Sequence, residues 1–365
     1  MWPHVGGAPT LPAVGDLVVE ANIAQLEPDT DPHSVAPVLA RDRPRVLQFT
    51  EPLPDNLLDA AAAALAEIPE VGFRVYGRAV DPSLRWLERF AHVRDLAIDL
   101  WHATSFDLLS VFTNLERLSL GQTASKRPSL GFLPHLPKLE VLRVEAHDRD
   151  FAAIADVEGL RELHLRVPRS KTLDPLRGHP SLQVVAMDFG GIRDLTPLAE
   201  IPRLRAVELY QVRKLDTDDL AALGELKSLI ALSLGALRNV EHFAALTLGP
   251  RNTLRYLTIE RMLGLQTLAH LAGLDALEQL YLVEAKPRDG RLDLVARAPD
   301  LRHLVVGDHY PKHQLEATEA VFRGETLWVR GTSLRGDPDR RNVDVRWRRP
   351  VEQYLSLPAA PLRSR

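Results

Sequence analysis

The chain contains no cysteine among its 365 residues, which excludes disulfides, thiolate zinc sites and a thiol nucleophile. It also lacks a run of about 18 apolar residues, the length that a membrane-spanning helix requires. The opening stretch, MWPHVGGAPTLPAVGD, has neither the basic start nor the apolar segment of a secretory signal. We therefore expect a cytoplasmic protein.

A strong charge of one sign is missing as well. The formal net charge is −4, which argues against nucleic acid as the main partner, because binding to phosphates relies on dense lysine and arginine. Lysine is scarce, with 7 lysines against 38 arginines, and alanine and leucine abound, which suggests a bacterium with a GC-rich genome. The hydrophobic content of 45% is sufficient for a substantial core.

Motifs for catalysis, cofactors and metals are absent from the sequence. There is no glycine-rich phosphate loop, no H-E-x-x-H and no G-x-S-x-G. His309 and His313 have the spacing of a metal-binding pair, but Pro311 between them disfavours a helix that would align both rings. The aspartates of residues 216–219 fit a helix start better than a calcium loop. The sequence predicts no enzyme, no cofactor and no metal.

What the sequence has instead is a repeated phrase of 18 residues. LTPLAEIPRLRAVELYQV (195–212) follows LDPLRGHPSLQVVAMDFG (173–190) and FAAIADVEGLRELHLRVP (151–168), and all three carry apolar residues at phrase positions 1, 4, 7, 10, 13 and 15. His179, at position 7, is an exception. About twelve copies start 21 to 25 residues apart between residues 61 and 332, which indicates a repeat architecture.

Each copy changes its period partway. Positions 1 to 10, spaced by three, predict a short α- or 3₁₀-helix with one buried face, and positions 13 and 15 predict a strand. Asp174-Pro175 and Thr196-Pro197 indicate helix starts, with a capping oxygen before a proline. A unit of this size cannot bury its apolar face alone, so we expect the copies to stack and their strands to form a parallel sheet.

The pattern L-x-x-L-x-x-L-x-x-L-x-x-L-x-L resembles the leucine-rich repeat, in particular the 22-residue variety of internalins and the phosphatase-regulator class. The resemblance implies an α/β solenoid: a curved horseshoe with a parallel concave β-sheet and short helices or 3₁₀ turns on the convex side. It also implies binding of another macromolecule as the usual activity. The family commonly has asparagine at position 18, and this chain has none there, so its turns must satisfy their backbone groups otherwise.

The two ends lie outside the array of residues 61–332. Residues 1–60 are predicted to form an N-terminal capping region, with RVLQFT (45–50) as a first strand. Residues 333–365 are predicted to form a C-terminal cap and basic tail, with NVDVRW (342–347) as a closing strand. This tail has eight arginines against four acids, which suits either contact with an acidic partner or nucleic acid, or a solvated end.

A partner would meet the outward side of the sheet, at positions 12, 14 and 16. One group there consists of small residues (231, 233 and 235) flanked by tyrosines and carboxylates, which predicts a shallow groove. A second group is a mixed-charge strip in the preceding repeats. The candidate partner-binding residues are Glu208, Tyr210, Ser233, Tyr256, Glu260, Tyr281, Arg143, His164 and Arg166. Tyrosine is enriched among binding hot spots, although tyrosines can also simply cover a sheet and charged strips are often solvated.

These residues favour a non-enzymatic module that captures a protein or peptide in an immunity, scaffold or regulatory role. The carboxylates of the groove suggest that the partner has a basic segment. Two alternatives stay open. One is a small-ligand-binding or accessory enzyme that uses the groove at Tyr210 and Tyr256, and the other is a self-associating structural protein.

Overall fold

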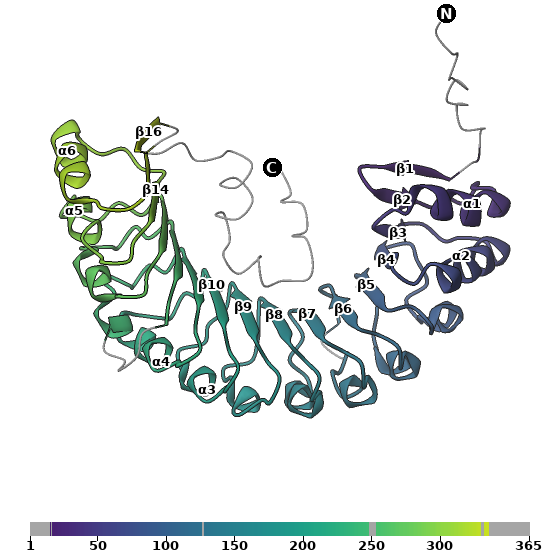
Figure 1. The fold of residues 1–365 in the computed structure, drawn as a ribbon. Helices are drawn as coiled ribbons and strands as arrows, with labels where there is room; N and C mark the ends of the chain where they lie inside the picture. The colour runs from purple at the N-terminus through teal and green to yellow at the C-terminus, as the bar shows by residue number, and fades with distance from the viewer. Residues whose placement is uncertain (1–14, 16, 126–127, 248–252, 330–331, 336–365) are drawn as a thin grey trace, which may run out of the picture. The chain divides into compact units, whose positions relative to one another are not determined.

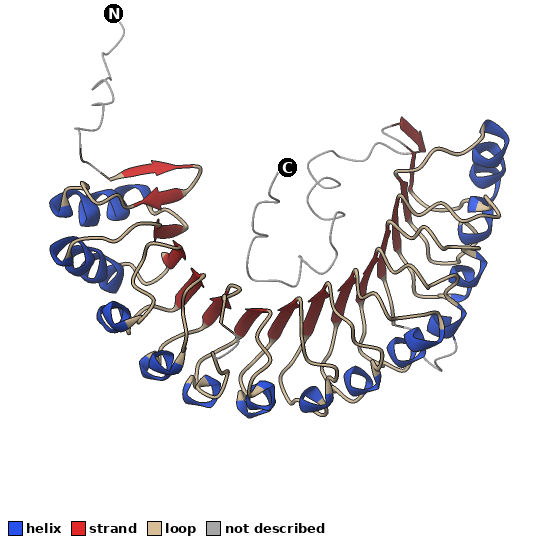
Figure 2. Cartoon of the chain, turned by 180° about the vertical axis from the view of Figure 1, so that it is seen from behind, coloured by secondary structure: helices blue, strands red, loops and turns tan. Residues whose placement is uncertain are grey.

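The structure is a computed structural model that describes residues 15, 17–125, 128–247, 253–329 and 332–335. The chain divides into two compact units, Met1–Glu140 (unit 1) and Val141–Arg365 (unit 2). In each unit, strands lie along one side and helices along the other (Figures 1 and 2). None of the helices in the described residues is long and apolar enough to cross a membrane.

Unit 1 begins with an antiparallel pair of strands and continues with parallel ones. Its strands are β1 (Val18–Glu20), β2 (Ile23–Gln25), β3 (Val46–Phe49), β4 (Gly72–Gly77), β5 (Asp95–Leu100) and β6 (Arg117–Leu120). Its α-helices are α1 (Pro32–Asp42) and α2 (Asp55–Glu67), and its 3₁₀-helices are η1 (Arg85–Phe90), η2 (Asp107–Val111) and η3 (Leu133–His135). The predicted strand at 45–50 is β3, and β1 and β2 precede it.

Unit 2 consists of parallel strands up to β15, and β16 pairs with β15 in the antiparallel sense. Its strands are β7 (Val141–Glu145), β8 (Glu162–Arg166), β9 (Val184–Asp188), β10 (Ala206–Tyr210), β11 (Ala231–Gly235), β12 (Tyr256–Glu260), β13 (Gln279–Val283), β14 (His303–Val306), β15 (Thr326–Val329) and β16 (Thr332–Arg335). The predicted closing strand at 342–347 lies outside the described residues.

Short helices connect the strands of unit 2. The 3₁₀-helices are η4 (Phe151–Asp156), η5 (Asp174–Leu176), η6 (Asp218–Leu220), η7 (Ala244–Thr247) and η8 (Ala269–Gly273). The α-helices are α3 (Thr196–Ala199), α4 (Ala221–Gly224), α5 (Leu292–Val295) and α6 (Lys312–Val321). This alternation of strand and short helix is the one that the change of period within each phrase predicts.

The core lies between the strands and the helices, where the apolar phrase positions meet. In the copy at 195–212, all six of these side chains are at most 1% exposed: Leu195, Leu198, Ile201, Leu204, Val207 and Leu209. Val207 and Leu209 are the strand positions 13 and 15, so positions 12, 14 and 16 of the same strand face outward. Strands β5 and β13 show the predicted alternation directly, because their inward residues are buried and their outward residues are half-buried.

The helical segments are capped two residues earlier than the sequence predicted. Thr172 accepts a hydrogen bond from the Asp174 N–H (3.0 Å), and Asp194 accepts one from the Thr196 N–H (2.8 Å). Neither Asp174 nor Thr196 is itself the cap, so the prediction was wrong at these positions. The same turn recurs at Ser105, Ser129 and Thr267. A small polar side chain immediately before the phrase thus satisfies a donor at the helix start.

The turns that follow the strands of unit 2 have no asparagine at phrase position 18, and they form backbone hydrogen bonds between neighbouring repeats. In seven successive copies the residue at phrase position 17 is non-glycine with a left-handed φ between 48° and 61°: Ala146, Val167, Phe189, Gln211, Ala236, Arg261 and Glu284. The N–H of each of the first six donates to the position-16 carbonyl of the next repeat, at 2.7–2.9 Å. The backbone therefore continues the ladder for one residue beyond each strand, and this bond satisfies a group that would otherwise lack a partner.

Candidate functional site

The nine candidate residues all lie on the outward side of unit 2, on strands β7, β8 and β10–β13. The strand register joins the two predicted groups in one central row at phrase position 14. From β7 to β14 this row reads Arg143, His164, Ala186, Glu208, Ser233, Thr258, Tyr281 and Val305. The charged strip and the tyrosine group are thus parts of one continuous surface, which we call the sheet face.

Tyr210 lies across the glycine of the neighbouring strand. A Cβ atom built on Gly235 would lie 2.4 Å from Tyr210 Cδ2, so the ring occupies the space that a side chain at position 235 would fill. Arg261 Nη1 donates to the Tyr210 hydroxyl at 3.3 Å from two repeats further along. The Tyr210 ring therefore covers the predicted shallow groove at Gly235, because glycine has no side chain to keep the neighbouring ring away from the sheet.

Tyr256 also lies against small side chains. It packs on a cluster formed by Val184, Ala206 and Ala231, which are paired with one another and with Tyr256 across β9–β12. These three residues are at most 1% exposed, although they belong to the outward side of the sheet. Tyr256 remains half-buried, so the tyrosine both seals the small residues and presents part of its ring to solvent.

A line of contacting side chains runs along the ends of the strands. Arg166 pairs with Glu145 (3.3 Å) and lies over the Phe189 ring at 5.3 Å, and Phe189 meets Tyr210 edge to face at 6.0 Å. Arg261 then links Tyr210 to Glu284, with which it pairs at 2.9 Å. Hydrogen bonds to Tyr210 and Glu284 raise the pKa of Arg261 above its usual value.

Sequence reasoning missed Phe189 and Arg261 in this line. Both occupy phrase position 17, where the strand has ended and its alternation no longer applies. The left-handed turn directs their side chains back along the edge of the sheet, where they contact Tyr210. The signal available in the sequence was that an aromatic residue and an arginine occupy the same phrase position in two copies, 72 residues apart.

The candidate residues differ in exposure. Arg166 is the most open, with 56% of its side chain exposed. Tyr210, Tyr256, Glu260, Tyr281, Arg143 and His164 are half-buried. Glu208 and Ser233 are only 8% exposed, so the centre of the sheet face is shielded from water. Charges in this centre act through a lower dielectric than those on an open surface, which strengthens their effect on a bound partner.

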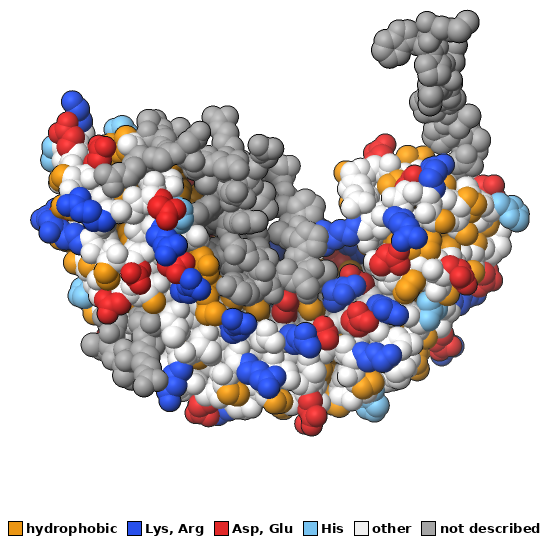
Figure 3. Space-filling view, in the orientation of Figure 1, with side chains coloured by type: hydrophobic (Ala, Val, Ile, Leu, Met, Phe, Trp, Pro, Cys, Tyr) orange, Lys and Arg blue, Asp and Glu red, His pale blue; other side chains and the backbone are white. Residues whose placement is uncertain are grey.

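The sheet face is acidic over strands β7–β12. Its outward positions carry five carboxylates, Glu145, Glu162, Asp188, Glu208 and Glu260, against two guanidinium groups, Arg143 and Arg166, for a net charge of −3 with histidine neutral. By contrast, the flank of the described repeats carries acidic and basic side chains side by side (Figure 3). Over these strands the formal charge of the sheet face is therefore negative.

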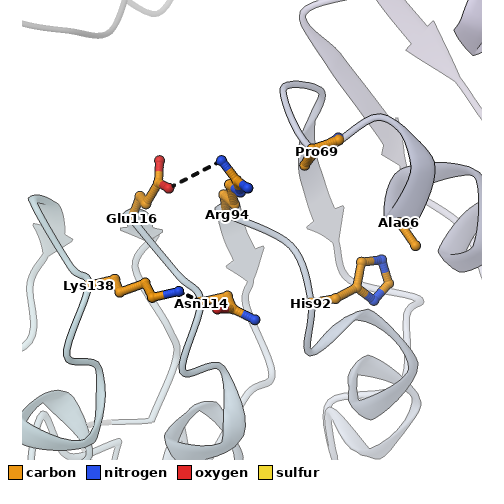
Figure 4. Close-up of a pocket in the computed structure, with 7 residues that line it drawn as sticks. All are labelled: Ala66, Pro69, His92, Arg94, Asn114, Glu116 and Lys138. Carbon is orange, nitrogen blue, oxygen red and sulfur yellow. Dashed lines mark hydrogen bonds and ion pairs between the residues drawn. The ribbon is translucent and has the colours of Figure 1, made fainter.

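Unit 1 contains a separate cavity of about 440 Å³ that the sequence did not indicate. It lies beside the segments that lead into strands β5 and β6. Its lining residues are Ala66, Pro69, His92, Arg94, Asn114, Glu116 and Lys138 (Figure 4). Lys138 donates to Asn114 at 2.7 Å, and Arg94 lies 3.6 Å from Glu116. Most of its polar groups are thus engaged with one another, and none of the nine candidate residues lines it.

Comparisons with known proteins concern the fold. No protein-family model matches the chain, and no curated protein matches it. Among solved structures, an internalin (InlF) from Listeria monocytogenes matches with 18% identity and a TM-score of 0.52, over 78% of this chain and 77% of that one. The leucine-rich repeat domain of the type III effector XopL shares 22% identity at a TM-score of 0.39, over 62% and 72% of the two chains.

The internalin likeness covers most of both chains, and the repeated strand–helix unit of the structure is the one that the 18-residue phrase predicts. The chain has the leucine-rich-repeat fold. At 18% identity the likeness concerns the fold alone. Within this fold, the candidate residues occupy outward positions of the strands.

Proposed function

We propose that this leucine-rich-repeat protein binds a protein or peptide on the sheet face of unit 2, without catalysis, and that the bound segment is basic. The observation that carries the proposal is the net charge of −3 on the outward side of β7–β12, next to the half-buried tyrosines. Carboxylates attract a basic chain, and tyrosine rings supply contact area at a low cost in side-chain entropy. An immunity, scaffold or regulatory role in a bacterial cytoplasm fits this activity.

The test compares two variants of the full chain in a capture experiment from native lysate. The face variant combines Tyr281→Ala with Glu260→Gln, two half-buried positions on β13 and β12. Tyr210 and Tyr256 are left intact because they pack on Gly235 and on the alanine cluster, so their loss would disturb the sheet itself. The control variant combines Glu225→Gln with Asp275→Asn, two exposed residues near the helices.

We expect a partner that the wild type and the control variant retain and the face variant loses. With purified partner, loss of one tyrosine anchor should weaken binding by about 2 kcal/mol, or about 30-fold. Equal binding by both variants would contradict the proposal. Measurement of the mass of the wild type in solution, by light scattering, distinguishes a foreign partner from self-association.

A further inference from the structure

The same chain contains a segment whose charge is opposite to that of the acidic part of the sheet face. Residues 340–349 read RRNVDVRWRR, with five arginines, one aspartate and one tryptophan, for a net charge of +4. These residues lie outside the described structure. Their composition is that of the basic, aromatic segment that the carboxylates and tyrosines of the face would select.

The chain between the last described strand and this segment is long enough for the contact. Strand β16 ends at Arg335 and belongs to the same unit as the acidic strands. Eight strand spacings separate β16 from β8, or about 38 Å at about 4.8 Å each. The fourteen residues from Arg335 to Arg349 extend up to about 46 Å. The segment can therefore reach every acidic strand from β12 back to β8.

We infer that residues 340–349 bind the acidic sheet face of their own chain and compete there with the basic partner. This inference rests on the proposed function, because it assigns the same face to both occupants. Attachment to the chain gives the segment an effective concentration of about a millimolar, so even a weak contact occupies the face for much of the time. The partner must then displace the segment to bind.

The experiment uses a fluorescent synthetic peptide of residues 336–353, the wild type and three full-length variants. The tail variant replaces Arg340, Arg341, Arg346, Arg348 and Arg349 by glutamine, which removes the competing charge but keeps the chain length. A second protein adds Glu208→Gln and Glu260→Gln to the tail variant, and a third adds the control pair Glu225→Gln and Asp275→Asn instead. Fluorescence anisotropy measures peptide binding to each protein and to the wild type.

We expect the peptide to bind the tail variant at least about 10-fold more tightly than the wild type, because the wild-type face is already occupied by the tethered segment. The two glutamines on the face should abolish this binding, and the control pair should leave it unchanged. Binding should also weaken as salt is added. Equal binding to wild type and tail variant, or binding unaffected by the face substitutions, would overturn the inference.

Two further measurements test whether a variant has unfolded and whether the segment binds a second copy of the protein. If Glu208→Gln unfolds the protein by circular dichroism, Glu260→Lys at the more exposed position replaces the pair. If the wild-type mass rises with concentration and the tail variant's does not, the segment binds a second copy and the intramolecular inference fails. Capture of the lysate partner is scored separately. If a lysate partner is captured but the peptide does not bind the tail variant, the result supports the proposed function and contradicts the inference. If the peptide binds but no partner is captured, the result supports only the contact between the tail and the sheet face.

Discussion

At the scale of single residues, His179 shows how the fold accommodates an exception to the repeat. It occupies an otherwise apolar phrase position and is 3% exposed. Its Nε2 lies 3.1 Å from the carbonyl oxygen of Val157, the residue at the same position of the preceding copy, and the Ser181 N–H approaches Nδ1 at 3.4 Å. The ring thus links two neighbouring repeats by hydrogen bonds at a position where the copies on either side carry the apolar residues Val157 and Ile201.

Burial lowers the pKa of His179 below its usual value, although its bonds to backbone carbonyls oppose this effect. The unfolded chain therefore takes up a proton at a higher pH than the folded chain does. Stability is fully present above the usual histidine pKa of about 6.5 and is lost as the pH falls below it. The wild-type free energy of unfolding should decrease between pH 7.5 and 5, by at most about 1.4 kcal/mol per pH unit for this one proton.

His179→Leu should flatten this pH dependence, and it should cost about 1 kcal/mol at pH 7.5 through the lost hydrogen bond. Urea unfolding at several pH values measures both effects. A variant whose stability falls with pH as steeply as the wild type's would show that His179 does not contribute to the slope.

Gly235 and Tyr210 form a second residue-scale pair. Gly235→Ala should cost about 1–3 kcal/mol of unfolding free energy, because the new methyl group displaces the Tyr210 ring. In a Tyr210→Ala background the same substitution should cost almost nothing, since the ring is gone. Gly307→Ala is the matched control at the same phrase position, where the nearest atom to the new Cβ lies 3.4 Å away. A cost for Gly235→Ala that persists without Tyr210 would contradict the packing described.

At the scale of elements, a left-handed residue follows each of seven successive strands of unit 2, β7 to β13. Left-handed backbone costs about 1–2 kcal/mol for a residue with a Cβ atom. In unit 2 the chain accepts this cost in seven successive copies, and in six of them the left-handed residue's N–H donates to the next repeat. The exits are therefore places where stability can be gained without touching the core.

Ala236→Gly should raise the free energy of unfolding by about 0.5–1 kcal/mol, because Ala236 has a φ of 50° that glycine adopts without strain. The same change in α4, Ala222→Gly, should lower it by a similar amount, since glycine is unfavourable within a helix. Denaturant midpoints of the two variants should move in opposite directions. Destabilisation by both would mean that the left-handed exit does not strain the alanine.

At the scale of the whole molecule, stability is spread over contacts between neighbouring repeats. Leu198 is fully buried in the copy at 195–212, and Leu198→Ala should cost about 2–5 kcal/mol through lost burial and the cavity left behind. Because each repeat of a solenoid contacts its neighbours, hydrogen exchange should rise first in β9–β11 and much less in β2–β4. A uniform loss of protection in both units would show instead that the chain opens as one cooperative body.

The sequence by itself was sufficient for the leucine-rich-repeat fold, the alternation of strand and helix and the inward positions of each strand. These depend on periodicity, which a repeated chain displays many times over. The caps at Thr172 and Asp194 and the exits at position 17 were missed, because they depend on backbone conformation at the junctions between two periods.

Only the tertiary structure decided how the candidate residues lie on the sheet face. Comparison of the outward phrase positions placed Tyr210 and Tyr256 beside small residues. The structure shows that their rings pack against those residues. It also joined the charged strip and the tyrosines in one row through the strand register. The physical reason is that side-chain contacts between repeats depend on rotamers and on which neighbour leaves space, and alternation along a single strand specifies only the face on which a residue stands.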